Sequence, residues 1–245
     1  MTNLFLIPII LCYAGTAAIL PIYIKKLYNG TSVKTLLMKM ACSTLFVLCC
    51  VFSSLLAGTF GTVYSKYMLT GFLCSWLGDA LLHRETKMIK YVFGGISFLA
   101  AHIFFIYAYM KTAADLFPGI KAVSVKEIII VAVLSCVCIA VILLAKLKLN
   151  KLAVPIFIYA VVLMFMFVKA SGLGFGLMTG GFRSGAAAFA LLTAGALLFA
   201  LSDGSLALGF FGEKSAFKRN FNIATYFLGQ LLLATSAAFV AFPAE

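Results

Sequence analysis

The chain consists almost entirely of apolar stretches, each about as long as a membrane is thick. A helix needs about 20 apolar residues to cross the hydrocarbon core, and eight candidate spans are found at residues 3–23, 35–57, 67–83, 91–110, 127–145, 152–169, 185–210 and 221–242. Hydrophobic residues make up 64% of the chain and charged residues 11%, far from the balance of a soluble domain. We therefore expect an all-α polytopic membrane protein with about eight transmembrane helices, forming a single transmembrane domain over residues 1–245.

The basic residues are unevenly distributed among the connections between these spans. The connections after the first, third, fifth and seventh spans hold 13 of the 19 basic residues: Lys25, Lys26, Lys34, Lys39, Arg84, Lys87, Lys90, Lys146, Lys148, Lys151, Lys214, Lys218 and Arg219. Because cytoplasmic connections carry an excess of Lys and Arg, we expect these in the cytoplasm and both termini on the non-cytoplasmic side. The first basic residues follow the first span, so a retained helix is favoured over a signal peptide.

This distribution also accounts for the net charge of +12 without a nucleic-acid partner. A basic face of this kind would contact anionic membrane lipids. We expect a multi-pass protein of the cell membrane, that is, of a bacterial inner membrane or a plasma membrane.

The segment 171–185 is rich in glycine yet still apolar. It is compatible with a plain loop or with a re-entrant loop whose backbone is satisfied by surrounding protein. Its G-x-G spacing does not follow a strand, so a phosphate-binding glycine loop is not indicated.

Two aspartates, Asp79 and Asp203, lie inside long apolar spans. A charged residue at the centre of a membrane helix costs about 2.5–3.5 kcal/mol on the insertion scale, so such residues usually face the protein interior and have a function. Both aspartates come late in spans predicted to run from outside to inside, which places them at a similar depth. We interpret them as one site, although a structural role as hydrogen-bond anchors is the alternative.

Other polar side chains are predicted to accompany them. In the eighth span Asn222, Tyr226 and Gln230 are spaced four residues apart and share one helix face. Each could bind substrate or link helices by hydrogen bonds. The remaining candidates in the other spans are His102, Tyr159 and Ser75, for which an interhelical or local backbone hydrogen bond is the alternative.

An internal repeat is a further hypothesis. Three pairs of residues share a sequence offset of 124, namely Asp79 and Asp203, His102 and Tyr226, and Lys90 and Lys214. Four spans in each half would give a parallel repeat of the kind found in some transporters.

The chemistry that suits two carboxyl groups in an apolar cavity is acid–base catalysis. Desolvation and a second carboxylate nearby both favour the protonated form of one member. Such a pair offers one acid and one base at neutral pH, as in glycosidases. The chain has only two histidines, and its seven cysteines all fall within predicted spans and are interpreted as packing residues. We expect no metal and no cofactor, with a mixed site of one His and two Asp as the alternative.

Four segments resemble the signature blocks of the YhhN/lysoplasmalogenase family. They are G-D-x-x-L around Asp79, an F-x-x-x-H-like block around His102, S-D-x-x-L-A around Asp203, and a T-Y-x-x-x-Q-like ending at Gln230. They occur in order over about residues 68–236. The third block departs from the aliphatic pattern with Gly204-Ser205, and in the second Tyr107 follows His102 by five positions rather than three.

The resemblance implies an eight-span hydrolase that cleaves the vinyl ether bond of alkenyl lysophospholipids, giving a fatty aldehyde and a glycerophospho-base. Asp79 and Asp203 would be the catalytic groups, with the acid and the base unassigned. A basic cytoplasmic rim would hold the phosphate of the lysophospholipid. The residues that would orient substrate or water are His102, Tyr226, Gln230, Ser75, Asn222 and Tyr159.

Two other functions remain open from the sequence. Intramembrane Asp, His and Tyr residues also serve as proton relays, so the alternative is a proton- or cation-coupled membrane transporter. A weaker alternative is a lipid-binding protein without enzymatic activity. The oligomeric state is not predicted.

Overall fold

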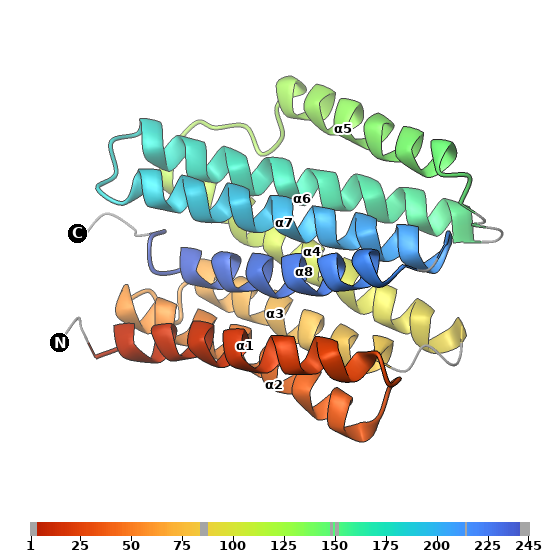
Figure 1. The fold of residues 1–245 in the computed structure, drawn as a ribbon. Helices are drawn as coiled ribbons and strands as arrows, with labels where there is room; N and C mark the ends of the chain where they lie inside the picture. Colours follow the sequence, from red (N-terminus) through yellow and green to blue (C-terminus); the bar gives the residue numbers. More distant parts are fainter. Residues whose placement is uncertain (1–3, 84–87, 148, 150–151, 214, 241–245) are drawn as a thin grey trace.

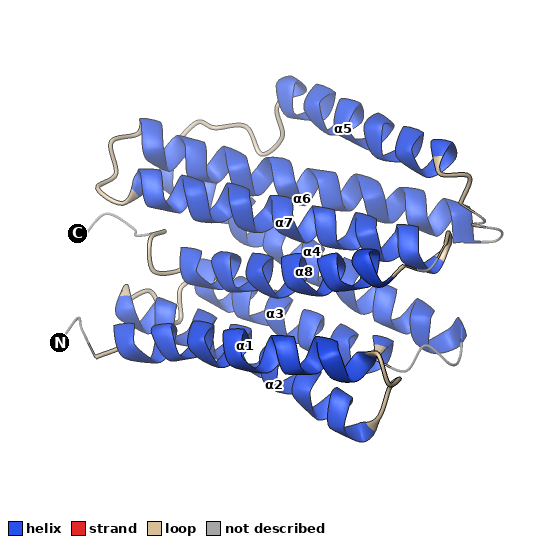
Figure 2. Ribbon diagram, viewed as in Figure 1, coloured by secondary structure: helices blue, strands red, loops and turns tan. Residues whose placement is uncertain are grey.

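The fold of the chain is a bundle of long helices. The structure, a computed structural model, describes residues 4–83, 88–147, 149, 152–213 and 215–240. Within these ranges there are eight helices and no strand (Figures 1 and 2). The helices are α1 (Leu6–Leu27), α2 (Val33–Leu56), α3 (Val63–Leu82), α4 (Met88–Leu116), α5 (Val125–Leu144), α6 (Ala153–Thr179), α7 (Gly185–Phe210) and α8 (Ala216–Ser236). The expected all-α polytopic fold is confirmed.

Six of these helices, α1, α2, α4, α5, α6 and α7, are long and apolar enough to cross a membrane. The exceptions are α3 and α8, which were predicted as spans. Both contain polar residues at four-residue intervals, Ser75 and Asp79 in α3 and Asn222, Tyr226 and Gln230 in α8. Their lower hydropathy therefore marks the helices that carry most of the candidate site residues.

Consecutive helices run in opposite directions and, except for α4 and α5, lie side by side (Figure 1). The pairs α3–α4 and α7–α8 pack closely, α8 also contacts α1 and α2, and α4 contacts α6. Helix α5 lies at the edge of the bundle against α6 (Figure 1). As a result α1, α3, α5 and α7 end, and α2, α4, α6 and α8 begin, at the same end of the bundle.

Side-chain caps fix where several helices begin. Ser32 accepts a hydrogen bond from the backbone N–H of Thr35 at the start of α2, and Ser124 does the same for Glu127 at the start of α5. Such caps satisfy backbone donors that have no partner within the helix. The predicted eighth span begins later than α8, which starts just after the N-cap Ser215.

The glycine-rich segment 171–185 is neither a plain loop nor a re-entrant loop. Helix α6 continues through it to Thr179, and only residues 180–184 connect α6 to α7. A Cβ atom on Gly174 would lie 2.7 Å from the Cα atom of Phe189 in α7. The glycine therefore allows the backbones of α6 and α7 to approach, as small residues do between membrane helices.

The predicted span 152–169 would place Lys169 at a helix end, and this prediction is wrong. Because α6 extends to Thr179, Lys169 lies within the helix and is buried. Its Nζ donates hydrogen bonds to Glu127 Oε1 (2.7 Å) and to the carbonyl oxygen of Ala122 (2.6 Å). The pair ties the first turn of α5 to the middle of α6.

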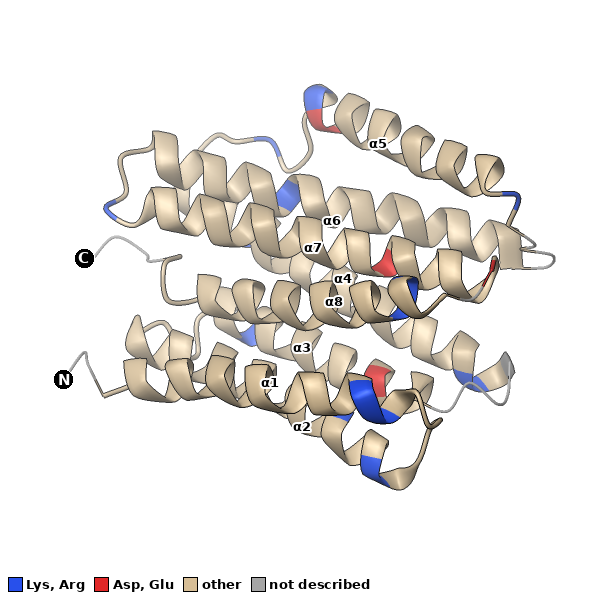
Figure 3. Cartoon of the chain, in the orientation of Figure 1, with Lys and Arg blue, Asp and Glu red and all other residues tan. Residues whose placement is uncertain are grey.

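Basic positions surround the end of the bundle where α1 ends and α8 begins (Figure 3). Arg84, Lys87, Lys148, Lys151 and Lys214, which were assigned to connections at this end, lie outside the described residues, as do the outer ends of the first and last predicted spans. All seven cysteines are free and lie in helices.

Candidate functional site

A cavity of about 610 Å³ lies at this basic end of the bundle, and both Asp79 and Asp203 line it. Its walls come mainly from α1, α3, α4, α7 and α8. Residues at helix ends, among them Tyr28, His83 and Ser215, form the outer part. Phe98, Tyr226 and Phe227 lie further along their helices and close the inner part with aromatic rings.

Asp79 is almost fully buried in α3 and accepts three contacts. Its Oδ2 accepts hydrogen bonds from the hydroxyls of Ser43 and Tyr226, each at 2.6 Å. Its Oδ1 lies 3.0 Å from Lys39 Nζ. A lysine cation and two hydroxyl donors thus pair with this carboxyl group inside the bundle.

Asp203 in α7 has a different set of neighbours. Its Oδ2 accepts a hydrogen bond from Tyr159 OH at 2.5 Å and lies 3.4 Å from His102 Nε2. His102 is fully buried, and its Nε2 is also 3.0 Å from Tyr159 OH. In the described part of the chain, the only basic side chain within ion-pair distance of Asp203 is therefore a histidine, which carries charge only when protonated.

Each of the two carboxylates is contacted by a helix from the other half of the chain. Tyr226 of α8 donates to Asp79 of α3, and His102 of α4 contacts Asp203 of α7. The two aspartates are 124 positions apart, and so are His102 and Tyr226. The cavity thus lies between the α3–α4 pair and the α7–α8 pair.

A comparison with known families agrees with this arrangement. The model of the YhhN family matches residues 34–237, which contain both aspartates and all of their contacts described above. The chain belongs to the YhhN family. No curated protein and no solved structure gives a significant match. Membership of the YhhN family is consistent with a hydrolase, and the family match covers α3 to α8 completely together with nearly all of α2.

The structure of this YhhN-family protein distributes the other candidate residues differently. Asn222 lines the cavity, but its Nδ2 donates to the Ser202 carbonyl oxygen and hydroxyl, both at 2.8 Å, and so also links α8 to α7. His102 and Tyr159 reach Asp203 without lining the cavity themselves. Ser75 and Gln230 are fully buried away from the cavity wall.

The sequence interpretation missed Lys39 and Ser43, the α2 partners of Asp79. Lys39 was assigned to a cytoplasmic connection, whereas α2 begins at Val33 and places it inside the helix. The signal was present, because Thr35, Lys39 and Ser43 are spaced four residues apart, as are the polar residues of α8. Spacing alone could have assigned one face of α2 to the site.

His83 is the last residue of the predicted third span, 67–83, and is the C-cap residue of α3. It is buried at the end of α3 and lines the cavity. Its Nε2 lies 3.0 Å from Thr35 Oγ1 and 3.3 Å from the carbonyl oxygen of Ser32. In this way α3 is joined to the N-cap of α2. Within the described residues, no group of three or more His, Cys, Asp or Glu side chains is placed to hold a metal ion.

Proposed function

We propose that this YhhN-family protein is a lysoplasmalogenase-like hydrolase, which cleaves the vinyl ether bond of alkenyl lysophospholipids with Asp79 and Asp203 as its catalytic groups. The observation that carries the proposal is that these two carboxylates, from different halves of the chain, line one cavity in an otherwise apolar bundle. The cavity combines aromatic walls with a basic outer part, which suits an amphiphile with an anionic headgroup.

The contacts of the two carboxylates support different roles. Asp79 contacts a lysine cation and two hydroxyl donors, from Lys39, Ser43 and Tyr226. Asp203 has one hydroxyl donor and a histidine beside it, and no lysine or arginine of the described residues lies within ion-pair distance. We therefore assign Asp203 as the general acid and Asp79 as the base.

In the first step Asp203 donates its proton to the carbon of the vinyl double bond that does not carry the ether oxygen. The double-bond electrons form the new C–H bond, and an oxocarbenium ion results. The Asp79 carboxylate stabilises this cation, which is the kind of charge stabilisation that an apolar site strengthens.

In the second step water attacks the cationic carbon and Asp79 accepts its proton, giving a hemiacetal. As the hemiacetal collapses, Asp79 returns this proton to the departing glycerol oxygen and the hemiacetal hydroxyl proton passes to Asp203. One water is consumed, a fatty aldehyde and a glycerophospho-base leave, and both carboxyl groups return to their starting forms.

The test is aldehyde release from an alkenyl lysophospholipid by purified protein in detergent. We expect D79N and D203N each to lower the rate by about 10²–10⁴-fold, the usual contribution of general acid–base catalysis. The matched control is D115N, because Asp115 is an exposed residue of α4 that pairs with Lys111 away from the cavity. Either aspartate variant at the wild-type rate, with D115N also unchanged, would refute the assignment.

The same assay separates hydrolysis from transport. Detergent-solubilised protein has no proton gradient, so aldehyde formation there requires catalysis alone. Solute uptake that depends on a proton gradient, with no aldehyde formed, would support the transporter instead.

A further inference from the structure

The proposed hydrolysis leaves Arg219 without a role, although its guanidinium is unusually placed. Arg219 lies in the first turn of α8 and lines the cavity. Its Nε and Nη2 are buried and make no hydrogen bond to any described residue. Buried donors of a charged group are nearly always paired. The partner of these two atoms is therefore expected to come from a bound molecule.

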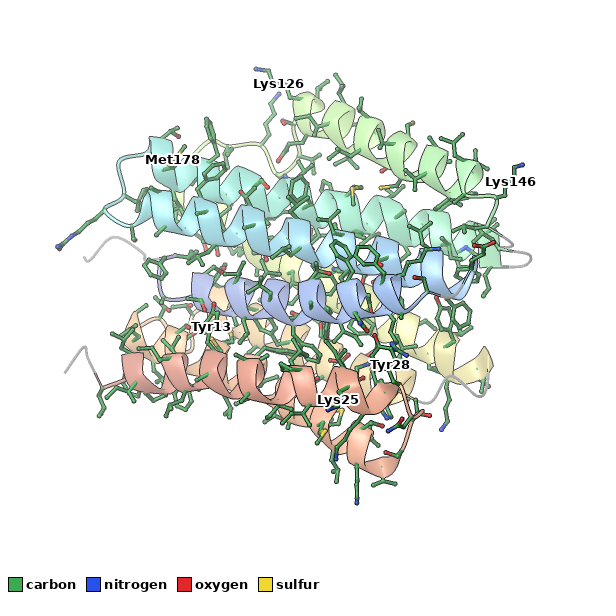
Figure 4. The ribbon with its side chains drawn as sticks, viewed as in Figure 1. Tyr13, Lys25, Tyr28, Lys126, Lys146 and Met178 are labelled. Carbon is green, nitrogen blue, oxygen red and sulfur yellow. The ribbon has the colours of Figure 1, made fainter. Side chains whose placement is uncertain are left out.

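The guanidinium of Arg219 lies over an aromatic ring. Its Cζ lies 4.5 Å from the centre of the Tyr28 ring, at the end of α1. Asn220 Nδ2 donates a hydrogen bond to Tyr28 OH at 2.9 Å, which holds the ring in place. Tyr28 is labelled in Figure 4, between the end of α1 and the start of α8. A cation–π contact uses none of the N–H donors of the guanidinium, so Nε and Nη2 stay available.

The available edge has the geometry of an oxyanion receptor. Nε–H and one Nη–H of an arginine form a planar fork that binds two oxygens of a carboxylate or phosphate at once. Because Asp79 is already paired with Lys39, it does not need this arginine for charge balance. A lysine at position 219 would keep the charge but lose the fork.

The positions of Arg219 and Tyr226 along α8 indicate where a ligand would lie. Arg219 precedes Tyr226 by seven residues on α8, about 10 Å nearer the outer end of the cavity. Tyr226 marks the depth of Asp79, to which it donates. A molecule with its reacting bond at the carboxylates therefore presents its next polar group toward Arg219.

We infer that Arg219, stacked on Tyr28, is a binding site for a phosphate group and takes the phosphodiester headgroup of a single-chain ether phospholipid. The inference rests on the proposed function for the identity of the lipid and names the residue that recognises its headgroup. Lys218, the neighbouring cation, also lines the cavity, but its Nζ donates to the carbonyl oxygen of Glu213 at 3.0 Å.

The experiment measures binding without turnover. The probe is a 1-alkyl lysophosphocholine, whose saturated ether has no vinyl bond to cleave, added to purified protein in a maltoside detergent. A 1-alkylglycerol of the same chain length, which lacks the phosphate, and inorganic phosphate are the comparison ligands. The variants are R219Q and R219K, with K126Q as the matched control, because Lys126 is exposed in the first turn of α5 and does not line the cavity.

We expect R219Q to weaken binding of the alkyl lysophosphocholine by about 10- to 100-fold. R219K should also bind it more weakly than the wild type, while K126Q should bind as the wild type does. Alkylglycerol binding should be unchanged in all three variants, which also reports that they are folded. If R219Q does not fold, the test is the binding of alkyl lysophosphocholine by R219K compared with the wild type.

Several results would overturn the inference. Wild-type binding of the alkyl lysophosphocholine by R219K is one, and an equal loss in K126Q is another. Inorganic phosphate that binds as tightly as the lipid, and depends on Arg219, would assign the site to free phosphate. A wild-type protein that binds the alkyl lipid through Arg219 but releases no aldehyde would refute the proposed function alone.

Discussion

At the scale of single residues, the ion pair between Lys39 and Asp79 compensates two charges that are buried inside the bundle. The two side chains are only 14% and 2% exposed and lie 3.0 Å apart. Removing one partner of a buried pair leaves an uncompensated charge and costs about 3–5 kcal/mol, whereas removing both is often neutral. The pair therefore has a testable signature that does not depend on the substrate.

We expect K39M to lower the free energy of unfolding by about 3–5 kcal/mol, and K39M/D79N to recover most of the loss. The measurement is denaturant unfolding in detergent. The matched control is K111M, because the Lys111–Asp115 pair is 47% and 37% exposed and exposed ion pairs contribute little to stability. Equal losses in K39M and K111M, or no recovery in the double variant, would contradict this account.

The residues that the sequence could predict are those whose chemistry is rare in their surroundings. Asp79 and Asp203 are conspicuous because carboxylates are rare in apolar spans, and the structure places both on one cavity wall. Lys39 was not predicted because lysines are common near span ends. Position 39 lies within the predicted span 35–57, but its contact with Asp79 depends on how α2 packs against α3, which hydropathy does not contain.

At the scale of helices, the close contact of α7 with α8 positions the residues on either side of the cavity. A Cβ atom on Gly229 would lie 2.9 Å from the carbonyl oxygen of Gly195 and 3.0 Å from the backbone N of Phe199. The backbone of α8 therefore rests directly on that of α7. Tyr226 is one turn from this contact, so the spacing of the two helices sets how it reaches Asp79.

We expect G229A to separate α8 from α7, with a loss of about 1–3 kcal/mol in stability, as for other overpacked sites, and a fall in aldehyde release. The control is G95A in α4, where an added Cβ would meet no atom within 4 Å and where alanine stabilises a helix by about 0.5–1 kcal/mol. Both properties are measured on the same preparations. A G229A protein as stable and active as G95A would show that the contact is not limiting.

Hydropathy predicted some helices closely and others not. The predicted span 185–210 coincides with α7 (Gly185–Phe210), whereas the span 152–169 missed the last ten residues of α6 (Ala153–Thr179). The missed part is rich in glycine, which breaks helices in water but is common in membrane helices. Its helical state depends on the fit of Gly174 against Phe189, a tertiary contact that no single-sequence pattern contains.

At the scale of the whole molecule, the site is shared between two halves. The α3–α4 pair and the α7–α8 pair contribute one aspartate each. Asp79 of α3 is contacted by a residue of α8, and Asp203 of α7 is contacted by a residue of α4. This exchange is what a parallel repeat related by a two-fold axis would produce. The hypothesis of a repeat gains a structural basis that the slight similarity between the halves did not give. Neither half alone contains a complete site.

The distribution of basic residues predicts which end of the bundle faces the cytoplasm. The cavity lies at the end where the first, third, fifth and seventh predicted spans finish, and the connections after these spans hold 13 of the 19 basic residues. Connections rich in Lys and Arg stay in the cytoplasm, so we expect the cavity to face the cytoplasm and its basic rim to meet the anionic inner leaflet. Lipid substrates would then be drawn from that leaflet.

Reporter insertions in bacterial cells test this orientation. An alkaline phosphatase domain, active only outside the cytoplasm, should be inactive when inserted at residue 30, between α1 and α2, and active at residue 182, between α6 and α7. Insertion at residue 60, between α2 and α3, is a second position for the outer end and should also be active. The reverse pattern would place the carboxylates and Arg219 near the outer leaflet. Lipids of that leaflet would then have to supply the substrate, and the basic rim would no longer be explained by the positive-inside rule.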